Sequence, residues 1–244
     1  MTRTLEQAAA EASSCTKCRL AEGRTQVVYG VGAADADLLF IGEGPGFHED
    51  KQGEPFVGAA GQLLTKMLQG IGLERSEVYI ANIVKCRPPG NRDPQPDEIE
   101  ACTPWLVEQI SLLQPRVVVT LGNFATKFVL NTSTGITRLR GQVHDWHGRT
   151  VIPTFHPAAI LHGGGEKSRQ FQLLKDDFAL VRSTLDDPGT SESAAIPTIA
   201  AGEPATPEAA GAILEATATA STPGLTDRIV VPETDPADEQ LELF

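Results

Sequence analysis

The chain has 244 residues, of which 41% are hydrophobic and 5% aromatic, and it carries a formal net charge of −12. This length suits one domain of up to about 200 residues with additional segments, and the charge argues against a simple basic nucleic-acid-binding protein. The charge is uneven, because 10 of the 32 acidic and one of the 20 basic residues lie in 188–244. Residues 1–187, with 22 acidic against 19 basic residues, are therefore almost neutral and can carry a local basic surface.

Hydropathy along the chain argues against a membrane protein. No stretch is apolar for long enough to span a bilayer, and the N-terminus lacks the apolar core of a secretion signal. These features predict a cytoplasmic protein.

Apolar runs and helical patterns alternate along residues 1–187. A short helix is predicted at 4–14, a strand or loop at 27–32, and a polar loop at 47–58. Short apolar runs predict strands at 38–41, 78–84, 117–121 and 151–155. Helical spacing and start signals predict helices at 61–71, 96–113, 122–130 and 168–185. This alternation predicts an α/β fold, in which helices cover both faces of a parallel sheet.

The composition changes after residue 186. Alanine, threonine, proline, glutamate, serine and glycine dominate, and aromatic residues are absent until Phe244. Such a segment cannot bury enough apolar surface to offset its ordering entropy. We therefore predict a folded domain at 1–187, a disordered acidic linker at 188–239 and a distinct terminal peptide at 240–244.

Three predicted strands end at residues that are unusual for a turn. Glu43 lies within the glycine-rich loop 42–46, where the absence of a Cβ lets the backbone approach a ligand closely. Asn82 lies near the end of the predicted strand 78–84, and His156 follows the predicted strand 151–155. Because ligands bind at the carboxyl ends of parallel strands, these side chains predict a site at one edge of the sheet.

The four cysteines suggest a metal centre. Cys15 and Cys18 form a C-x2-C pair, Cys86 follows a predicted strand, and Cys102 lies in a predicted helix. Disulfides are disfavoured in the cytoplasm, so ligation of a metal is the preferred interpretation. Four thiolates suit structural zinc or an iron–sulfur cluster equally well, and spacing alone does not separate the two.

Several motifs together resemble the family 4 uracil-DNA glycosylases. They are Gly-Glu-Gly-Pro-Gly at 42–46, Asn-Ile-Val-Lys-Cys at 82–86, Arg-Pro-Pro-Gly-Asn-Arg at 87–92 and His-Pro-Ala-Ala-Ile-Leu at 156–161, in addition to the cysteine layout. The resemblance implies a three-layer fold with a four-stranded parallel sheet flanked by helices. It also implies a structural 4Fe-4S cluster, rather than zinc, held by Cys15, Cys18, Cys86 and Cys102.

The resemblance further implies a pocket for uracil extruded from DNA. Asn82 would read N3–H and O4 of the base, Phe56 would stack on its ring, and Gly42 and Gly44 would offer backbone N–H groups. His156 would donate a hydrogen bond to O2 of the departing anion. Glu43 is the favoured residue for positioning water, with Asn91 as the other candidate.

The same resemblance implies contacts with DNA. Ile160 or Leu161 would insert into the duplex where the base has left, and Lys167 and Arg169 would contact phosphates. The expected product is an abasic site, because no lysine is placed convincingly for lyase chemistry. The expected enzyme is a monomer. The alternative is a non-catalytic, metal- or cluster-stabilised adaptor that binds DNA or a clamp.

The terminal peptide resembles the segment by which bacterial proteins bind the replication sliding clamp. Its glutamine, spaced leucines and final aromatic residue are Gln240, Leu241, Leu243 and Phe244. An apolar anchor on a disordered tether would raise the local concentration of the domain at DNA.

Overall fold

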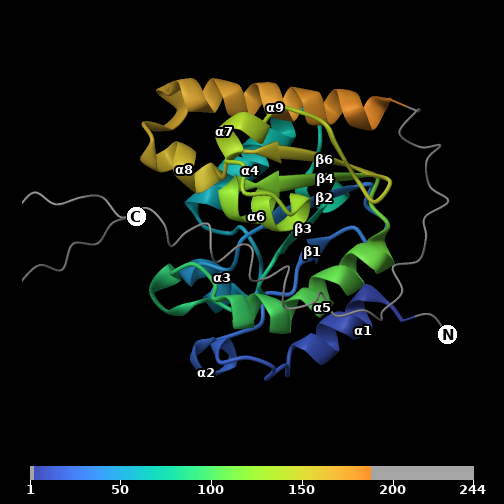
Figure 1. Ribbon diagram of the computed structural model, residues 1–244, viewed down its shortest axis with the longest axis vertical. Helices are drawn as coiled ribbons and strands as arrows, with labels where there is room; N and C mark the ends of the chain where they lie inside the picture. The colour runs from blue at the N-terminus through green and yellow to red at the C-terminus, as the bar shows by residue number, and fades with distance from the viewer. Residues whose placement is uncertain (1–2, 188–244) are drawn as a thin grey trace, which may run out of the picture. The chain divides into compact units, whose positions relative to one another are not determined.

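The computed structural model describes residues 3–187, so the predicted linker 188–239 and the predicted clamp-binding peptide 240–244 lie outside the described residues. Within 3–187, six strands form one sheet in the order β1-β3-β2-β4-β6-β5 (Figure 1). The strands are β1 (Val31–Gly32), β2 (Leu38–Gly42), β3 (Tyr79–Asn82), β4 (Val117–Leu121), β5 (His144–Trp146) and β6 (Arg149–Thr154).

The four inner strands β3, β2, β4 and β6 pair in parallel, which confirms the predicted parallel sheet. The strand number was wrong, because β1 and β5 add antiparallel edges and make the sheet mixed. β5 reverses into β6 through His147 and Gly148, whose φ values are 52° and 74°. Two positive φ angles are typical of a tight type I′ hairpin. This turn adds β5 to the edge of the sheet, and β5 is too short to be predicted from an apolar pattern in the sequence.

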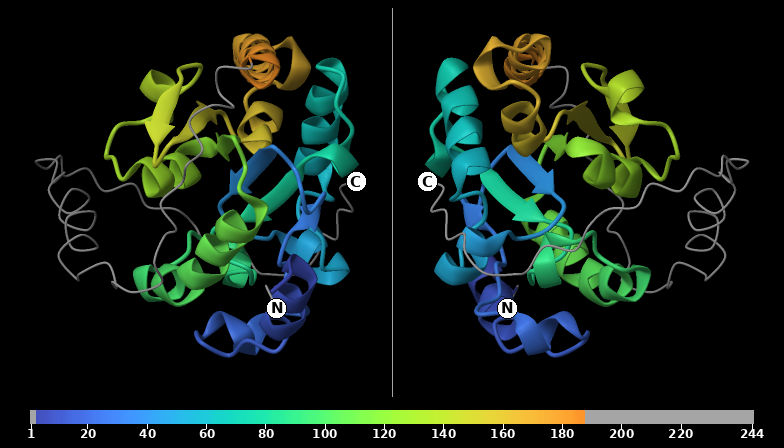
Figure 2. Two further views of the ribbon diagram at one scale, coloured as in Figure 1. Left: turned by 90° about the vertical axis from the view of Figure 1, so that its right-hand side faces the viewer. Right: turned by 90° about the vertical axis from the view of Figure 1, so that its left-hand side faces the viewer.

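Helices cover both faces of the sheet (Figures 1 and 2). The first layer contains α1 (Leu5–Ala12), α5 (Pro96–Leu113) and α6 (Gly122–Leu130). The second contains α4 (Ala59–Gly70), α8 (Pro157–His162) and α9 (Arg169–Asp186). Shorter elements are α2 (Leu20–Gly23), α3 (Phe47–Gln52), α7 (Ile136–Leu139) and the 3-10 turns η1 (Arg75–Glu77), η2 (Pro89–Asn91) and η3 (Gly165–Lys167).

The alternation of side chains along each strand creates two separate cores. On β2, Leu39 and Ile41 pack in the core beneath α1 and α5, whereas Leu38 and Phe40 pack in the core beneath α4 and α9. Successive strand residues point to opposite faces, so an unbroken apolar run serves both layers. Phe40 stacks on Phe178 of α9 with ring centroids 5.8 Å apart, and burying each such ring contributes about 1.5–3 kcal/mol.

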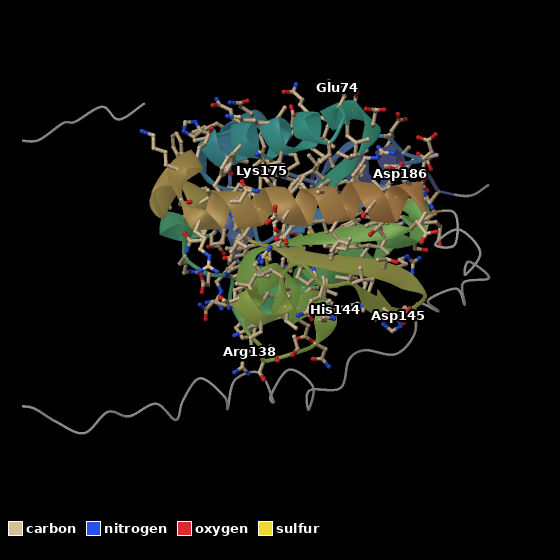
Figure 3. The ribbon with its side chains drawn as sticks, turned by 90° about the horizontal axis from the view of Figure 1, so that it is seen from above. Glu74, Arg138, His144, Asp145, Lys175 and Asp186 are labelled. Carbon is tan, nitrogen blue, oxygen red and sulfur yellow. The ribbon has the colours of Figure 1, made fainter. Side chains whose placement is uncertain are left out.

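Figure 3 looks onto α9, which lies across the sheet with Lys175 on its exposed side. The predicted helix at 4–14 is shorter in the structure and begins after Thr4, which forms a capping box with Gln7. The predicted loop at 47–58 was partly wrong, because it contains α3. Within residues 3–187, no helix is both long and apolar enough to cross a bilayer.

Candidate active site

The strand ends meet at one edge of the sheet, as the sequence predicted. Gly42 at the end of β2 pairs directly with Asn82 at the end of β3. Leu121 at the end of β4 pairs with Thr154 of β6, two residues before His156. The residues Glu43, Asn82 and His156 therefore lie along the same carboxyl edge, on parallel strands of one sheet.

Four of the five predicted uracil-binding residues are in close contact. A Cβ built on Gly42 would lie 2.4 Å from Asn82 Oδ1 and 2.8 Å from Phe56 Cζ. No side chain fits between these groups, so glycine is required at this position. Phe56 also stacks on the His156 ring, with centroids 5.5 Å apart and planes inclined by 29°. The structure thus brings the amide, the phenyl ring and the imidazole together around Gly42.

The Asn82 side chain is buried with an unused acceptor. It is 2% exposed, and its Oδ1 has no hydrogen-bond partner among residues 3–187. Leaving a buried polar atom unpaired typically costs about 1–3 kcal/mol. A ligand that donates a hydrogen bond to this oxygen would recover that free energy.

His156 is held in one tautomer. It caps the N-terminus of α8, and its Nδ1 accepts a hydrogen bond from the backbone N–H of Ala158 at 3.1 Å. Burial lowers the pKa of His156 to about 4, although nearby Glu49 opposes the shift. The ring is therefore neutral at pH 7 with its proton on Nε2, which leaves Nε2–H as a donor for a ligand.

Gly122, directly after β4, supports this histidine. Its φ is 88°, and an added Cβ would lie 2.9 Å from Cβ of His156. Both the left-handed backbone and the close approach require glycine. The residue after β4 therefore leaves space for the His156 imidazole and supplies no reactive side chain.

Glu43 lies in the loop after β2 and is partly buried. Burial, followed by the negative charge of Asp93, raises the pKa of its carboxyl group to about 7. The loop is fixed through its backbone, because Glu43 C=O accepts a hydrogen bond from Val84 N–H at 3.1 Å. A carboxyl group with such a pKa can gain and lose a proton near neutrality, which suits general acid–base chemistry.

The sequence did not reveal the contribution of Glu49. Its Oε1 accepts hydrogen bonds from the backbone N–H groups of Val57 and Gly58 at 2.9 and 3.0 Å. These two amides follow Phe56, which itself has a positive φ of 54°. Glu49 thereby holds the backbone that places the phenyl ring against His156. Only the folded chain brings α3 to this segment, so no local pattern signalled the contact.

The remaining predicted residues lie around this group. Gly44 packs against Val84, since a Cβ added there would lie 2.8 Å from Val84 Cγ2. Asn91 is exposed in η2, and its Oδ1 accepts a hydrogen bond from Arg87 Nε at 2.7 Å. Lys167 and Arg169 are both exposed near the start of α9.

The two candidates for insertion into DNA differ sharply in exposure. Ile160 is 1% exposed and packs in the core beneath α4 and α9. Leu161, the next residue of α8, is 40% exposed. Ile160 is therefore not accessible to DNA. Of the two candidates, only Leu161 is exposed enough for the expected insertion.

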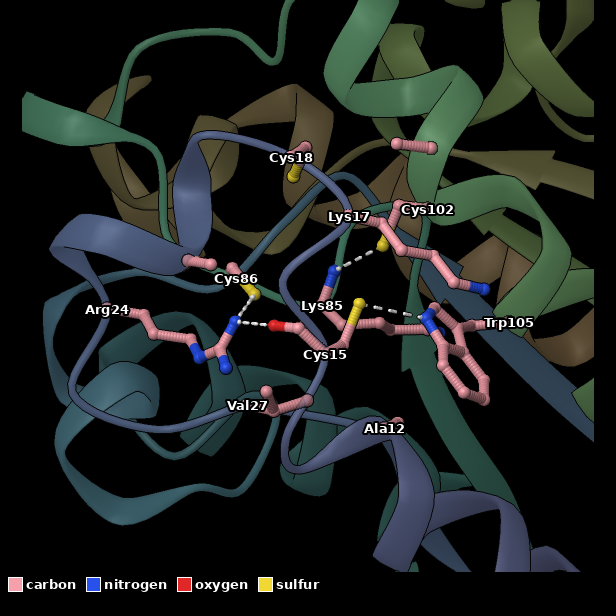
Figure 4. Close-up of a pocket in the computed structure, with 12 residues that line it drawn as sticks. Ala12, Cys15, Lys17, Cys18, Arg24, Val27, Lys85, Cys86, Cys102 and Trp105 are labelled. Carbon is pink, nitrogen blue, oxygen red and sulfur yellow. Dashed lines mark hydrogen bonds between the residues drawn. The ribbon is translucent and has the colours of Figure 1, made fainter.

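The four cysteines line one pocket, which lies on the α1–α5 side of the sheet (Figure 4). Cys15 Sγ accepts a hydrogen bond from Trp105 Nε1 at 3.4 Å, and Cys102 Sγ accepts one from the backbone N–H of Lys85 at 3.2 Å. Arg24 donates to Cys86 Sγ at 3.5 Å. Burial nevertheless raises the pKa of Cys86 to about 11 and also raises that of Cys102, and the neighbouring Arg24 and Lys85 only oppose this shift.

The spread of the sulfur atoms bears on what could bind there. Within residues 3–187, no three cysteine, histidine, aspartate or glutamate side chains converge tightly enough to hold a single metal ion. A zinc ion needs all its sulfur ligands about 2.3 Å from one centre. As placed, the four thiols line one pocket without forming such a site.

Taken together, these features define a class of protein: an α/β protein with an amide, a phenyl ring and an imidazole gathered at the strand ends, and with a pocket lined by four cysteines. Residues 29–179 match the family model for the uracil DNA glycosylase superfamily, and the chain belongs to this family.

Individual relatives support the same assignment. The chain is 45% identical to the type-4 uracil-DNA glycosylase of Sulfurisphaera tokodaii over 188 residues, covering 73% of this chain and 84% of the relative. It is 48% identical to that of Archaeoglobus fulgidus, covering 65% and 84%. It is 45% identical to that of Thermotoga maritima, covering 72% and 91%.

Proposed function

We propose that this protein is a monofunctional DNA glycosylase, which hydrolyses the N-glycosidic bond of uracil in DNA and leaves an abasic site. The observation that carries the proposal is the buried Oδ1 of Asn82, which lies beside the Phe56–His156 stack and has no hydrogen-bond partner within the described residues 3–187. Membership of the uracil DNA glycosylase superfamily supports it independently.

The reading groups match the edge of uracil. The Asn82 Oδ1 would accept a hydrogen bond from N3–H, while the amide NH2 would donate one to O4. Phe56 would stack on the face of the base, and backbone N–H groups at Gly42 and Gly44 would contact its oxygens. Cytosine presents an acceptor at N3 and a donor at N4, so the same amide orientation would reject it.

His156 would stabilise the leaving group. Breaking the C1′–N1 bond leaves the electron pair on uracil, and the negative charge spreads to O2. A neutral imidazole with its proton on Nε2 donates a hydrogen bond to that oxygen without itself needing to ionise. One preorganised donor of this type lowers a barrier by about 2.7–4 kcal/mol.

Glu43 would act on the water that attacks C1′. As a carboxylate it orients the water and receives a proton as the C1′–O bond forms, and the uracil anion finally takes up a proton from solvent. Its partly buried position within the 42–46 loop supports this role. Asn91 is the second candidate, although Arg87 already engages its Oδ1.

Contacts with DNA would surround this pocket. The exposed Leu161 would insert where the base has left the stack, and Lys167 and Arg169 would contact phosphates. Such phosphate contacts position DNA without reading its sequence.

Cys15, Cys18, Cys86 and Cys102 would hold a 4Fe-4S cluster. When bound, this group would cross-link the segment before α2, the segment after β3 and the middle of α5, and so brace the fold. The test is the iron and sulfide content and the visible absorption of aerobically purified protein. About four irons per chain, lost on Cys86→Ser, would support the cluster; a colourless protein with one zinc ion would contradict it.

Uracil release is the decisive test of activity. Oligonucleotides with one uracil opposite guanine, opposite adenine or in a single strand are incubated with protein, and free uracil is measured. Wild type should release it, while Asn82→Ala and His156→Ala should be slower by roughly 10²–10³-fold. His144→Ala, on edge strand β5, is the matched control and should retain the wild-type rate. DNA binding without any uracil release would instead support the adaptor.

The terminal peptide 240–244 would dock on a bacterial sliding clamp, tethered by 188–239 to an independently folding domain at 1–187. This proposal rests on the sequence alone. Deleting 240–244 should abolish binding to purified clamp and spare activity on short oligonucleotides; unchanged clamp binding would contradict it.

A further inference from the structure

Phe47 is an exposed aromatic residue that the proposed reaction does not use. It is the first residue of α3, directly after the 42–46 loop, and it is 49% exposed. Among residues 3–187, the exposed large hydrophobic side chains are few: Phe47, Val107, Val143 and Leu161. Of these, Phe47 alone is aromatic.

Two cations flank its ring. The Arg87 guanidinium carbon lies 5.2 Å from the ring centroid, and Lys51 Nζ lies 5.9 Å from it. Both distances allow cation–π attraction. Lys51 is one helical turn after Phe47, and the Arg87 side chain is oriented by its hydrogen bond to Asn91. An aromatic face beside two positive charges matches the bases and phosphates of a nucleic-acid strand.

The helix that carries Phe47 is anchored on its other side. Asp50 is buried and accepts a hydrogen bond from Thr25 N–H at 2.8 Å, while Glu49 binds the backbone after Phe56. A six-residue helix has little stability of its own. These two carboxylates hold α3 in place, so Phe47 and Lys51 present a fixed surface.

This surface adjoins the proposed pocket. The loop 42–46, which contains Gly42 and Glu43, continues directly into Phe47. The segment that carries Arg87 lies beside this loop, because Ile83 N–H and Val84 N–H donate to the carbonyl oxygens of Gly42 and Glu43. A nucleotide next to an extruded uracil would therefore pass over Phe47.

We propose that Phe47, with Arg87 and Lys51, forms a stacking platform for the unpaired nucleotide next to the extruded uracil. The inference rests on the proposed function and extends it, because it makes single-stranded DNA a preferred form of substrate. A base paired in a duplex cannot offer its face to Phe47, whereas a base in a single strand can. Arg87 and Lys51 would contact the neighbouring phosphates.

The test is binding of a single-stranded oligonucleotide that carries an abasic-site analogue, measured by fluorescence anisotropy. This ligand requires no catalysis. Phe47→Ala should weaken binding about tenfold, and Phe47→Trp should restore it. Val143→Ala, which removes another exposed apolar side chain, is the matched control and should bind as the wild type does. Melting temperatures confirm that each variant is folded.

Kinetics add a second readout. On single-stranded uracil DNA, Phe47→Ala should raise the concentration for half-maximal rate and leave the maximal rate within about twofold. The platform proposal would be overturned if Phe47→Ala bound the single strand as tightly as the wild type does. It would also be overturned if the substitution weakened binding to blunt duplex DNA as much as binding to single-stranded DNA. A third outcome separates the two proposals. If Phe47→Ala loses binding but the wild type releases no uracil, the proposed function is rejected and the platform is retained.

Discussion

The side-chain nitrogen of Lys85 donates a hydrogen bond to the backbone carbonyl oxygen of Asn82, 2.7 Å away. Lys85 is fully buried, and it also donates to Gln109 Oε1. Its own backbone N–H donates to Cys102 Sγ. One residue thus connects the strand end that carries Asn82 with the cysteine pocket. Figure 4 shows the hydrogen bond between Lys85 and Cys102 in this pocket.

Replacing Lys85 with methionine should therefore impair both stability and uracil release. The variant keeps the apolar stem but leaves two buried acceptors without a donor, at about 1–3 kcal/mol each. We expect the melting temperature to fall by roughly 5 °C or more, with a slower release of uracil at saturating substrate. Lys175→Met, on the exposed side of α9, is the control. If both variants had the same melting temperature and the same rate of uracil release, Lys85 would not connect the two sites.

The pH dependence should reveal the ionisation of Glu43. Its pKa is raised to about 7, and a carboxylate is needed to act on water. We expect kcat/KM to rise with pH through about 7. His156, with a pKa of about 4, stays neutral across this range and contributes no step. In Glu43→Gln the rise of kcat/KM should disappear. If the rise near pH 7 persisted in this variant, the ionisation that causes it would belong to another group.

The same shift predicts a change in stability. Because the pKa of Glu43 is higher in the folded than in the unfolded chain, folding binds protons between about pH 4.5 and 7, and stability falls as pH rises through this window. Glu43→Gln mimics the neutral form. Its melting temperature should exceed that of the wild type at pH 8 and match it near pH 4, as thermal unfolding at both values would show.

Glu49 should control the placement of Phe56. Glu49→Ala removes the acceptor of two backbone N–H groups that follow this ring. We expect uracil release to slow by at least tenfold, because misplacement of a positioning group by about 1 Å can cost 10²-fold. Glu49→Gln keeps one acceptor oxygen and should retain more activity. Glu6→Ala, an exposed residue of α1, provides the comparison.

Leu161 should matter only when the uracil lies in a duplex. Leu161→Ala removes the side chain that would fill the space left by the extruded base, and single strands have no such space. We expect slower release from duplex substrates and an unchanged rate on single strands. Val143→Ala serves as the control for loss of an exposed apolar group. An equal loss on both substrates would show that Leu161 has a different role.

The sequence by itself determined the inner sheet and the chemistry along its edge. The apolar runs at 38–41 and 117–121 predict strands, because only a strand buried on both faces needs every residue apolar. Parallel strands place their carboxyl ends together, so Glu43, Asn82 and His156 were expected to gather there. The cysteine set likewise identified the residues that line one pocket.

Only the tertiary structure decided how these groups are oriented and what holds them. Helix α3 has no apolar period of its own; its Glu49 and Asp50 carboxylates accept hydrogen bonds from backbone N–H groups outside the helix, at Val57, Gly58 and Thr25. Ile160 and Leu161 are neighbours of similar hydropathy, yet one packs in the core and the other faces solvent, because α8 is fixed in rotation by the layer beneath it. The same long-range packing leaves the Asn82 oxygen without a partner in the described part of the chain, 3–187. A local pattern specifies which residues are present but not which atoms remain free.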